Sequence, residues 1–294
     1  MKTLGIKQNF LGIEKEFSSF EKSKIAILPC GYEHTVSYGG GTANGPEAIL
    51  SASHQVEFYD EEVNRELIKE IGVATLPSLN FSKKKNEKAL QYIYNEAKNV
   101  LNENKFLLTL GGEHTISSAL IQAHSEKFPN LFVVQFDAHS DLRMEYQGNK
   151  FSHACIMMRV CEFLNPKNIV QVGIRAQCVE EANFIREKKI NTYYAHQIRL
   201  WKKKISWQEE IVNKLSENVY ITFDVDGFDP SIMPSTGTPE PNGLQWQETM
   251  DLLFLIGKKK KNSCQCHEKP QRLIMIIAKH KFEEKCIIFF DKPQ

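Results

Sequence analysis

The sequence predicts an α/β fold in which helices cover both faces of a single, mostly parallel β-sheet. Short runs of apolar and β-favouring residues alternate along the chain with segments whose apolar residues recur at helical spacing. Several of the short runs are apolar at nearly every position, which is typical of strands buried on both faces. We find no internal repeat and no linker, so we expect one domain over residues 1–294.

The predicted strands are short, and most of them lead directly into polar or glycine-containing segments. They are Lys24–Leu28, Val56–Tyr59, Phe106–Leu110, Leu131–Phe136, Ile169–Ile174, Thr192–Tyr194 and Val219–Phe223.

The predicted helices lie between these strands. One begins at Gly45-Pro46, because proline is favoured in the first helical turn. Another follows Thr115, which we expect to cap its N-terminus. The helices expected after the first are Asn86–Asn102, Ile116–Phe128, a segment around His153–Phe163, one near Val179–Glu187, Trp207–Leu215 and Gln245–Ile256.

Composition narrows the class of protein. The formal net charge is +1, which gives no electrostatic argument for binding nucleic acid or an anionic membrane. No apolar run reaches the length of a membrane span, and the first residues lack the apolar core of a signal peptide. The seven scattered cysteines fit a reducing compartment better than a disulfide framework. We therefore expect a cytoplasmic protein.

Three predicted strands end in residues that bind metal ions. His114 follows the first of them, Asp137, His139 and Asp141 follow the second, and Asp224 and Asp226 follow the third. Alternate residues of an extended segment share one face, so each cluster can point towards one place. Carboxylates this close together repel one another unless a cation lies between them. A solvated loop explains one such cluster, but three together indicate a metal site.

The ligand set predicts the kind of site. Four carboxylates and two imidazoles are too many for one tetrahedral zinc ion. Oxygen-rich ligation with some imidazole suits Mn²⁺, and a pair of ions bridged by carboxylates would use all six residues.

The same residues carry a resemblance to a known family. GGEHT at 111–115, DAHSD at 137–141, DVDGFDP at 224–230 and TGTPEPNGL at 236–244 resemble the ureohydrolases, the family of arginase and agmatinase. The segment EYQGNKFSHA at 145–154 and the pair Glu240-Pro241 look more like agmatinase than arginase. The resemblance runs from about Lys24 to Ile256.

The resemblance implies a three-layer α/β/α sandwich with two Mn²⁺ ions per subunit. It assigns His114, Asp137, Asp141 and Asp224 to one ion. It assigns Asp137, His139, Asp224 and Asp226 to the other. His153 matches a histidine thought to move protons at the mouth of the active site, and its alternative is an ordinary exposed histidine. The family also implies a homo-oligomer, either a trimer or a hexamer.

The implied reaction splits a guanidino group into urea and a primary amine. A water molecule held between two divalent ions loses its proton near neutral pH and can attack the guanidinium carbon. Asp141 would hold the attacking oxygen and pass its proton to the leaving amine, and His153 would exchange protons with solvent. Agmatine is the expected substrate. Arginine, guanidinobutyrate and formiminoglutamate are the alternatives for the same chemistry.

The resemblance fails after Ile256, so the family's final strand and helix are doubtful, and residues 257–294 form a divergent tail. The family continues with a strand whose glutamate binds the guanidinium, and none of Glu268, Glu283 and Glu284 aligns with it. Four lysines at 258–261 come from A-rich codons, so a frameshift is one origin of this tail and natural divergence is the other. The competing hypothesis is accordingly a catalytically impaired or inactive ureohydrolase-like protein.

Overall fold

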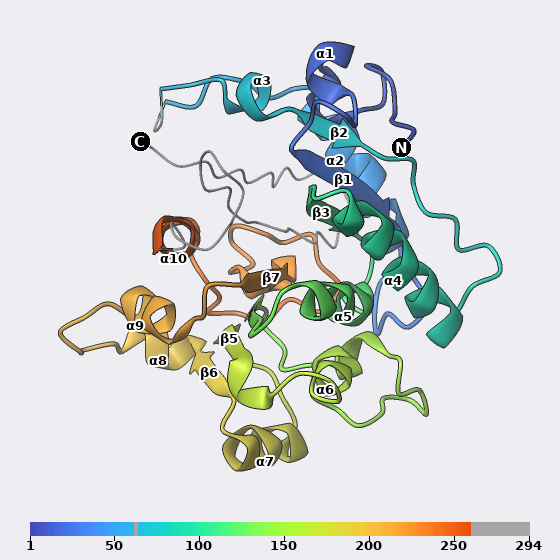
Figure 1. Cartoon of the computed structure of the whole chain (residues 1–294). Helices are drawn as coiled ribbons and strands as arrows, with labels where there is room; N and C mark the ends of the chain where they lie inside the picture. The colour runs from blue at the N-terminus through green and yellow to red at the C-terminus, as the bar shows by residue number, and fades with distance from the viewer. Residues whose placement is uncertain (62–63, 260–294) are drawn as a thin grey trace.

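The computed structural model describes residues 1–61 and 64–259, and all structural statements below refer to these residues. Parallel strands occupy the middle of the molecule and helices lie on both sides of them (Figure 1). The strands are β1 Ile25–Cys30, β2 Val73–Thr75, β3 Phe106–Gly111, β4 Phe132–Phe136, β5 Ile169–Ile174, β6 Asn191–Tyr194 and β7 Val219–Phe223.

The helices confirm most of the predicted segments. The α-helices are α1 Lys15–Ser18, α2 Gly45–Ser53, α3 Leu67–Ile71, α4 Glu87–Asn102, α5 Ile116–Lys127, α6 Ile156–Val160, α7 Val179–Lys188, α8 Ala195–Arg199, α9 Trp207–Lys214 and α10 Trp246–Lys259. Short 3₁₀ turns lie at Phe10–Gly12, Thr42–Asn44, His153–Cys155, Pro166–Asn168 and Val225–Gly227. No helix of the described part is both long and apolar enough to cross a membrane.

The described strands form two parallel sheets, whereas the sequence predicted a single sheet. The first has the order β2-β1-β3 and the second the order β6-β5-β4-β7. Joining them would take a strand with hydrogen-bonding partners on both β3 and β7, and residues 1–61 and 64–259 contain none. Helix α5 packs against α4 and against β7, so the two sheets share one helical layer.

Two local predictions were wrong. Val56–Tyr59 forms no strand, because the segment continues the turn that ends α2 and Tyr59 is exposed to solvent. Thr115 does not cap α5 with its side chain, since its hydroxyl donates instead to the carboxylate of Glu113 at 2.6 Å. The short strand β2 and the short helices α1, α3 and α8 were not predicted.

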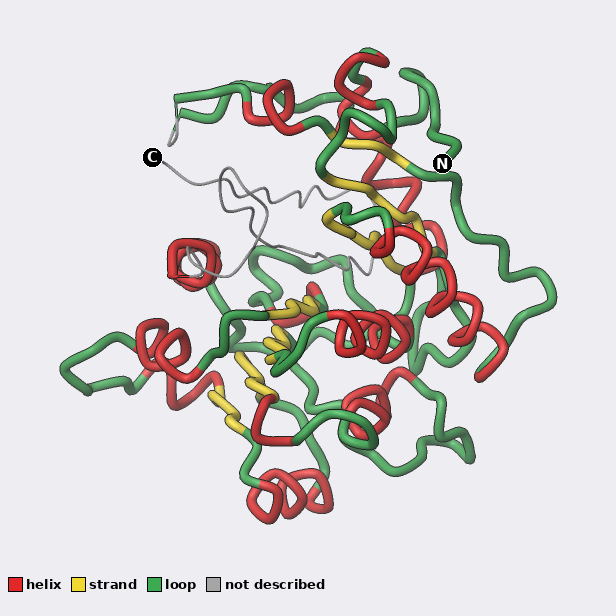
Figure 2. Tube along the Cα trace, viewed as in Figure 1, coloured by secondary structure: helices red, strands yellow, loops and turns green. Residues whose placement is uncertain are grey.

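The core lies between the strands and the flanking helices. Helices α4, α5 and α6 lie on one side of the strands in Figure 1, and α8, α9 and α10 on the other. Figure 2 shows that long loops join the strands to these helices. Strands β3, β4 and β7 are buried along nearly their whole lengths. The polar residues that follow their carboxyl ends therefore lie next to the core and line the cavity described next.

Candidate metal centre

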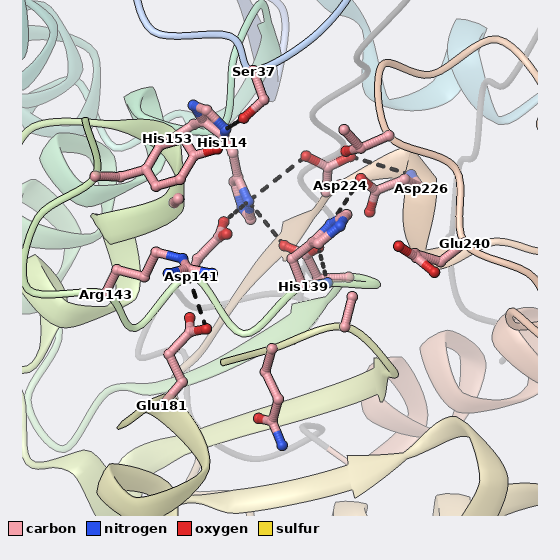
Figure 3. Close-up of a pocket in the computed structure, with 16 residues that line it drawn as sticks. Ser37, His114, His139, Asp141, Arg143, His153, Glu181, Asp224, Asp226 and Glu240 are labelled. Carbon is pink, nitrogen blue, oxygen red and sulfur yellow. Dashed lines mark hydrogen bonds and ion pairs between the residues drawn. The ribbon is translucent and has the colours of Figure 1, made fainter. Parts of the chain in front are cut away.

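The predicted metal ligands meet in one cavity at the carboxyl ends of β3, β4 and β7 (Figure 3). The ends of parallel strands are where open α/β sheets place their ligands. The cavity has a volume of about 280 Å³, near the lower end of the range for small-ligand sites. Its lining includes all six predicted metal ligands and His153.

The first candidate group consists of His114, Asp137 and Asp224, all three buried. Nδ1 of His114 lies 3.0 Å from Oδ2 of Asp137 and 3.8 Å from Oδ2 of Asp224. One ligand atom from each residue falls within 4.8 Å of the others, which is close enough to surround one ion.

The second candidate group consists of Asp137, His139 and Asp226. Nδ1 of His139 lies 3.2 Å from Oδ2 of Asp226 and 3.7 Å from Oδ1 of Asp137. Asp137 therefore offers one oxygen to each group, and this shared carboxylate is the geometry expected of a bridging ligand.

Asp141 lies beside the first group but is not one of its three members. Its Oδ2 is 3.0 Å from Nδ1 of His114. Its backbone has φ +54°, in the left-handed region that aspartate tolerates better than most residues. Burial and the neighbouring Asp137 raise the pKa of Asp141 to about 7. The structure thus brings Asp141 to the centre with a carboxyl group that titrates near neutrality before any metal binds.

The remaining ligands have strongly shifted pKa values in the metal-free site. Burial alone would lower the pKa of His139, but hydrogen bonds with Asp137 and Asp226 raise it to about 12. The pKa of His114 is also raised by Asp137 and Asp141, against the opposing effect of burial. Burial would raise the pKa of Asp137, but the two histidines hold it below its usual range. Each imidazole would therefore have to lose a proton to bind a metal ion.

Buried polar side chains behind the ligands fix their orientation. Nε2 of His114 lies 2.8 Å from the hydroxyl of Thr222, which leaves Nδ1 to face the metal group. The amide of Gln135 donates to Oδ2 of Asp137 at 2.8 Å. The sequence analysis missed both residues, although a polar residue inside a buried strand was a signal for each of them.

Close backbone packing holds the ligand loops together. A Cβ atom on Gly112 would lie 2.1 Å from the carbonyl oxygen of Tyr32. A Cβ on Gly227 would lie 2.9 Å from the backbone nitrogen of Asp137. Glycine is therefore required at both positions: Gly112 lets the loop before His114 pack on Tyr32, and Gly227 lets the loops of Asp226 and Asp137 approach each other.

His153 lies in the cavity wall and is held by residues from an earlier loop. Its Nδ1 lies 3.2 Å from the Thr35 hydroxyl and its Nε2 lies 3.0 Å from the Ser37 hydroxyl. The Thr35 hydroxyl donates to the buried carboxylate of Glu113 at 2.9 Å. Thr35 can then only accept a hydrogen bond from Nδ1–H, so the network favours the tautomer in which Nδ1 carries the proton and Nε2 is unprotonated. Thr35, Ser37 and Glu113 were not predicted as site residues.

The cavity wall contains further residues that sequence analysis did not single out for the site. Arg143 and Glu181 face one another at 3.9 Å, and the Arg143 guanidinium lies 5.4 Å from the centre of the Tyr146 ring. Glu240 lies on the wall near Asp226 (Figure 3). Tyr146 and Glu240 belong to segments that resemble the family, so the sequence indicated that these segments matter. It did not indicate that the two side chains line the cavity.

The donor set fits a pair of divalent cations. The six candidate ligands are four aspartates and two histidines of one small cavity; the two groups share Asp137, and hydrogen bonds with Thr222 and Gln135 orient His114 and Asp137. Uncompensated, these carboxylates would repel one another in a buried setting.

Comparison with known proteins identifies the family. The model of the arginase family matches residues 23–268. The chain belongs to the arginase family. It is 38% identical over 264 residues to the N(1)-aminopropylagmatine ureohydrolase of a Synechocystis species, covering 88% of this chain and 84% of the relative. It is 34% identical over 251 residues to the agmatinase of Bacillus cereus, covering 84% of this chain and 83% of that protein.

A solved structure agrees with these sequence matches. The agmatine ureohydrolase of Thermoplasma volcanium superposes with a TM-score of 0.73 at 26% identity, covering 90% of this chain and 83% of that one. The predicted α/β fold and the predicted agmatinase-like ureohydrolase, a hydrolase of linear amidines, are therefore confirmed. The family match extends beyond Ile256, where the sequence resemblance was predicted to end. The predicted tail from Lys260 onward lies outside the described residues.

Proposed function

We propose that this arginase-family ureohydrolase uses two Mn²⁺ ions to cleave a guanidino group into urea and a primary amine. The observation that carries the proposal is the position of Asp137, whose two carboxylate oxygens face two separate groups of candidate ligands. A site for one ion would not need a second group that shares this carboxylate. Manganese suits the ligand set because oxygen atoms outnumber imidazole nitrogens.

The ligand assignment is the one that the family resemblance implies, and the two groups His114, Asp137, Asp224 and Asp137, His139, Asp226 support part of it. His114, Asp137, Asp141 and Asp224 would hold one ion. Asp137, His139, Asp224 and Asp226 would hold the other. When bound, the ions would supply Lewis acidity and lower the pKa of a water molecule to near neutrality.

The surrounding side chains account for proton movement. Asp141 would accept the proton of the attacking water and deliver it to the leaving amine, since its carboxyl lies beside the metal ligands. His153 would exchange protons with solvent through Nε2, the ring nitrogen that is unprotonated when Nδ1–H donates to Thr35. Ser37 lies beside that nitrogen and would relay or orient the exchanging proton.

Agmatine-type guanidines are the proposed substrates. The relatives described above are named for agmatine and for its N1-aminopropyl derivative, and the latter is the better match by identity. The four described cysteines, Cys30, Cys155, Cys161 and Cys178, are free thiols, which supports a cytoplasmic location. By family resemblance we also propose a homo-oligomer, either a trimer or a hexamer.

The experiment is urea release by the full chain loaded with Mn²⁺. We expect urea from agmatine or N1-aminopropylagmatine, with less from arginine and 4-guanidinobutyrate, and little formamide, the corresponding product, from formiminoglutamate. Asp137→Asn is the matched control, because it keeps the side-chain shape and should abolish release. Urea release that is equal in the parent and in Asp137→Asn would refute the two-metal proposal. Absence of release from every amidine would favour the alternative of an inactive family member.

A further inference from the structure

We propose that the Glu240 carboxylate binds a cationic group of the substrate and selects agmatine-type dications over guanidines that carry a carboxylate. This inference rests on the proposed function, and it assigns Glu240 as a specificity-determining residue of that same cavity. Four observations support it, and they concern the other acids of the cavity, the position of Glu240, the support of its loop and the cations nearby.

Every acid that lines the described cavity, except Glu240, is either a candidate metal ligand or bonded to other described residues through its carboxylate. Asp137, Asp224 and Asp226 belong to the candidate metal groups, and Asp141 contacts His114. Glu181 accepts hydrogen bonds from the backbone nitrogens of Leu142 and Cys178 at 2.9 and 2.7 Å.

The Glu240 carboxylate itself accepts no hydrogen bond and forms no ion pair within the described part of the chain, although its backbone carbonyl does accept hydrogen bonds. Its carboxylate lies on the same side of the cavity as Asp226, across the metal ligands from His153 (Figure 3). A half-buried carboxylate that faces a cavity without a partner is a natural receptor for a cation.

The backbone holds Glu240 in a fixed position relative to the metal ligands. Nη2 of Arg175 donates to the carbonyl oxygens of Asp226 and Glu240, at 2.7 and 2.9 Å. One guanidinium thus ties the loop of Glu240 to a candidate metal ligand. The loop is closed at its end by Asp229, which accepts from the backbone nitrogen of Gly243 at 2.9 Å. The Glu240 side chain is therefore presented by a supported loop.

The cations near the cavity are already engaged. Arg143 is the single arginine or lysine that lines the described cavity, and it lies beside Glu181 and over the Tyr146 ring. Arg175 directs its N–H groups to carbonyl oxygens, although its charge lies near Glu240. A substrate carboxylate would therefore lack an unpaired cationic partner and would meet the negative charge of Glu240.

The charge balance of the loaded site leads to the same assignment. Two divalent cations would neutralise the four aspartates, so a guanidinium or ammonium group entering the cavity would find its anionic partner in Glu240. Sequence comparison with the family left no residue in that role, because the glutamate expected after the next strand does not align. Glu240, on the preceding loop, supplies an anionic partner for one cationic end of the substrate.

The test measures binding as well as turnover, using the full Mn²⁺-loaded chain and the variant Glu240→Gln. Calorimetric titration with agmatine should show affinity reduced roughly 10- to 100-fold in Glu240→Gln, as expected for loss of a charge-assisted contact. The matched control is Glu145→Gln, which removes an exposed acid that does not line the cavity and should leave affinity unchanged.

Two further probes identify which end of the substrate Glu240 binds. Butylguanidine carries only the guanidinium, and 1,4-diaminobutane carries only ammonium groups. Weakened binding of either probe in Glu240→Gln supports the inference and names the group. Glu240→Lys should raise the relative activity on 4-guanidinobutyrate over agmatine by at least about 10-fold.

The inference and the proposed function fail in different ways. Agmatine affinity in Glu240→Gln that stays within about twofold of the parent overturns the inference even if the parent releases urea. So does a parent chain that binds neither cationic probe. A parent that binds agmatine through Glu240 but releases no urea would overturn the proposed function and leave the inference in place.

Discussion

The hydroxyl of Thr35 lies 3.2 Å from Nδ1 of His153, a residue 118 positions further along the chain. The same hydroxyl accepts a hydrogen bond from the backbone nitrogen of His153 at 3.0 Å and donates to Glu113 at 2.9 Å. Thr35 therefore positions both the backbone and the ring of the proposed proton carrier.

We predict that Thr35→Val lowers kcat by roughly 10- to 100-fold with little change in KM, as loss of an orienting hydrogen bond does at other sites. Thr35→Ser keeps the hydroxyl and should recover most of the activity. The check is the pH profile of kcat, whose basic limb should move in Thr35→Val because the ring tautomer is no longer fixed. An unchanged profile would reduce Thr35 to a structural role.

Removing the His153 imidazole tests the proton carrier directly. His153→Asn should lower turnover by roughly 10²- to 10⁴-fold, because general acid–base catalysis contributes about that much. Bound manganese should not change, since His153 belongs to neither candidate metal group. Turnover within a few-fold of the parent, measured by urea release, would make His153 a bystander.

Metal binding should release protons. In the metal-free site Asp137 and Asp226 raise the pKa of His139 to about 12, and Asp137 and Asp141 raise that of His114. Both rings are then protonated at neutral pH and must lose their protons to bind an ion, so affinity should rise with pH.

Calorimetry in buffers with different ionisation enthalpies should show between about two and three protons released per chain at pH 7, one from each imidazole and part of one from Asp141, whose pKa is about 7. His139→Asn should release about one fewer proton. Mn²⁺ affinity that is independent of pH would show that the imidazoles are not ligands.

His124 should make the fold sensitive to mild acid. It is buried, and burial lowers its pKa to about 4, while its Nδ1–H donates to the Leu120 carbonyl at 2.7 Å. The unfolded chain takes up this proton near pH 6.5, whereas the folded chain does so only near pH 4, so stability falls as pH drops between these values.

At pH 5 the loss should be about 2 kcal/mol relative to pH 7, measured by urea unfolding of the metal-free protein. His124→Phe is an apolar ring of similar shape and should remove this part of the pH dependence. The same pH dependence in both proteins would assign it to other groups.

The sequence could predict that the six candidate metal ligands lie close together, because their signal is local. Asp137 and Asp224 directly follow the buried strands β4 and β7, and strand ends of a parallel sheet converge whatever the loops between them do. The i, i+2 spacing then placed side chains on one face without any knowledge of tertiary structure. The assignment of individual residues to individual ions remains a prediction.

The parts that sequence analysis missed depend on contacts between distant segments. Glu240 lines the cavity from a loop and Thr35 contacts His153 from another, and loop backbone has no periodicity from which a direction could be inferred. Val56–Tyr59 has strand-like composition but finds no neighbouring strand, which shows that β-propensity needs a partner. Thr115 looked like a helix cap, but the buried carboxylate of Glu113 competes for its hydroxyl.

The number of Mn²⁺ ions bound per chain tests the two-metal centre most directly. Elemental analysis of the purified, Mn²⁺-equilibrated chain should give about two ions, as a carboxylate-bridged pair requires. Asp137→Asn should bring the count well below one, because its oxygens face both candidate groups. A single tightly held zinc ion with no manganese, or two ions retained in Asp137→Asn, would contradict the account.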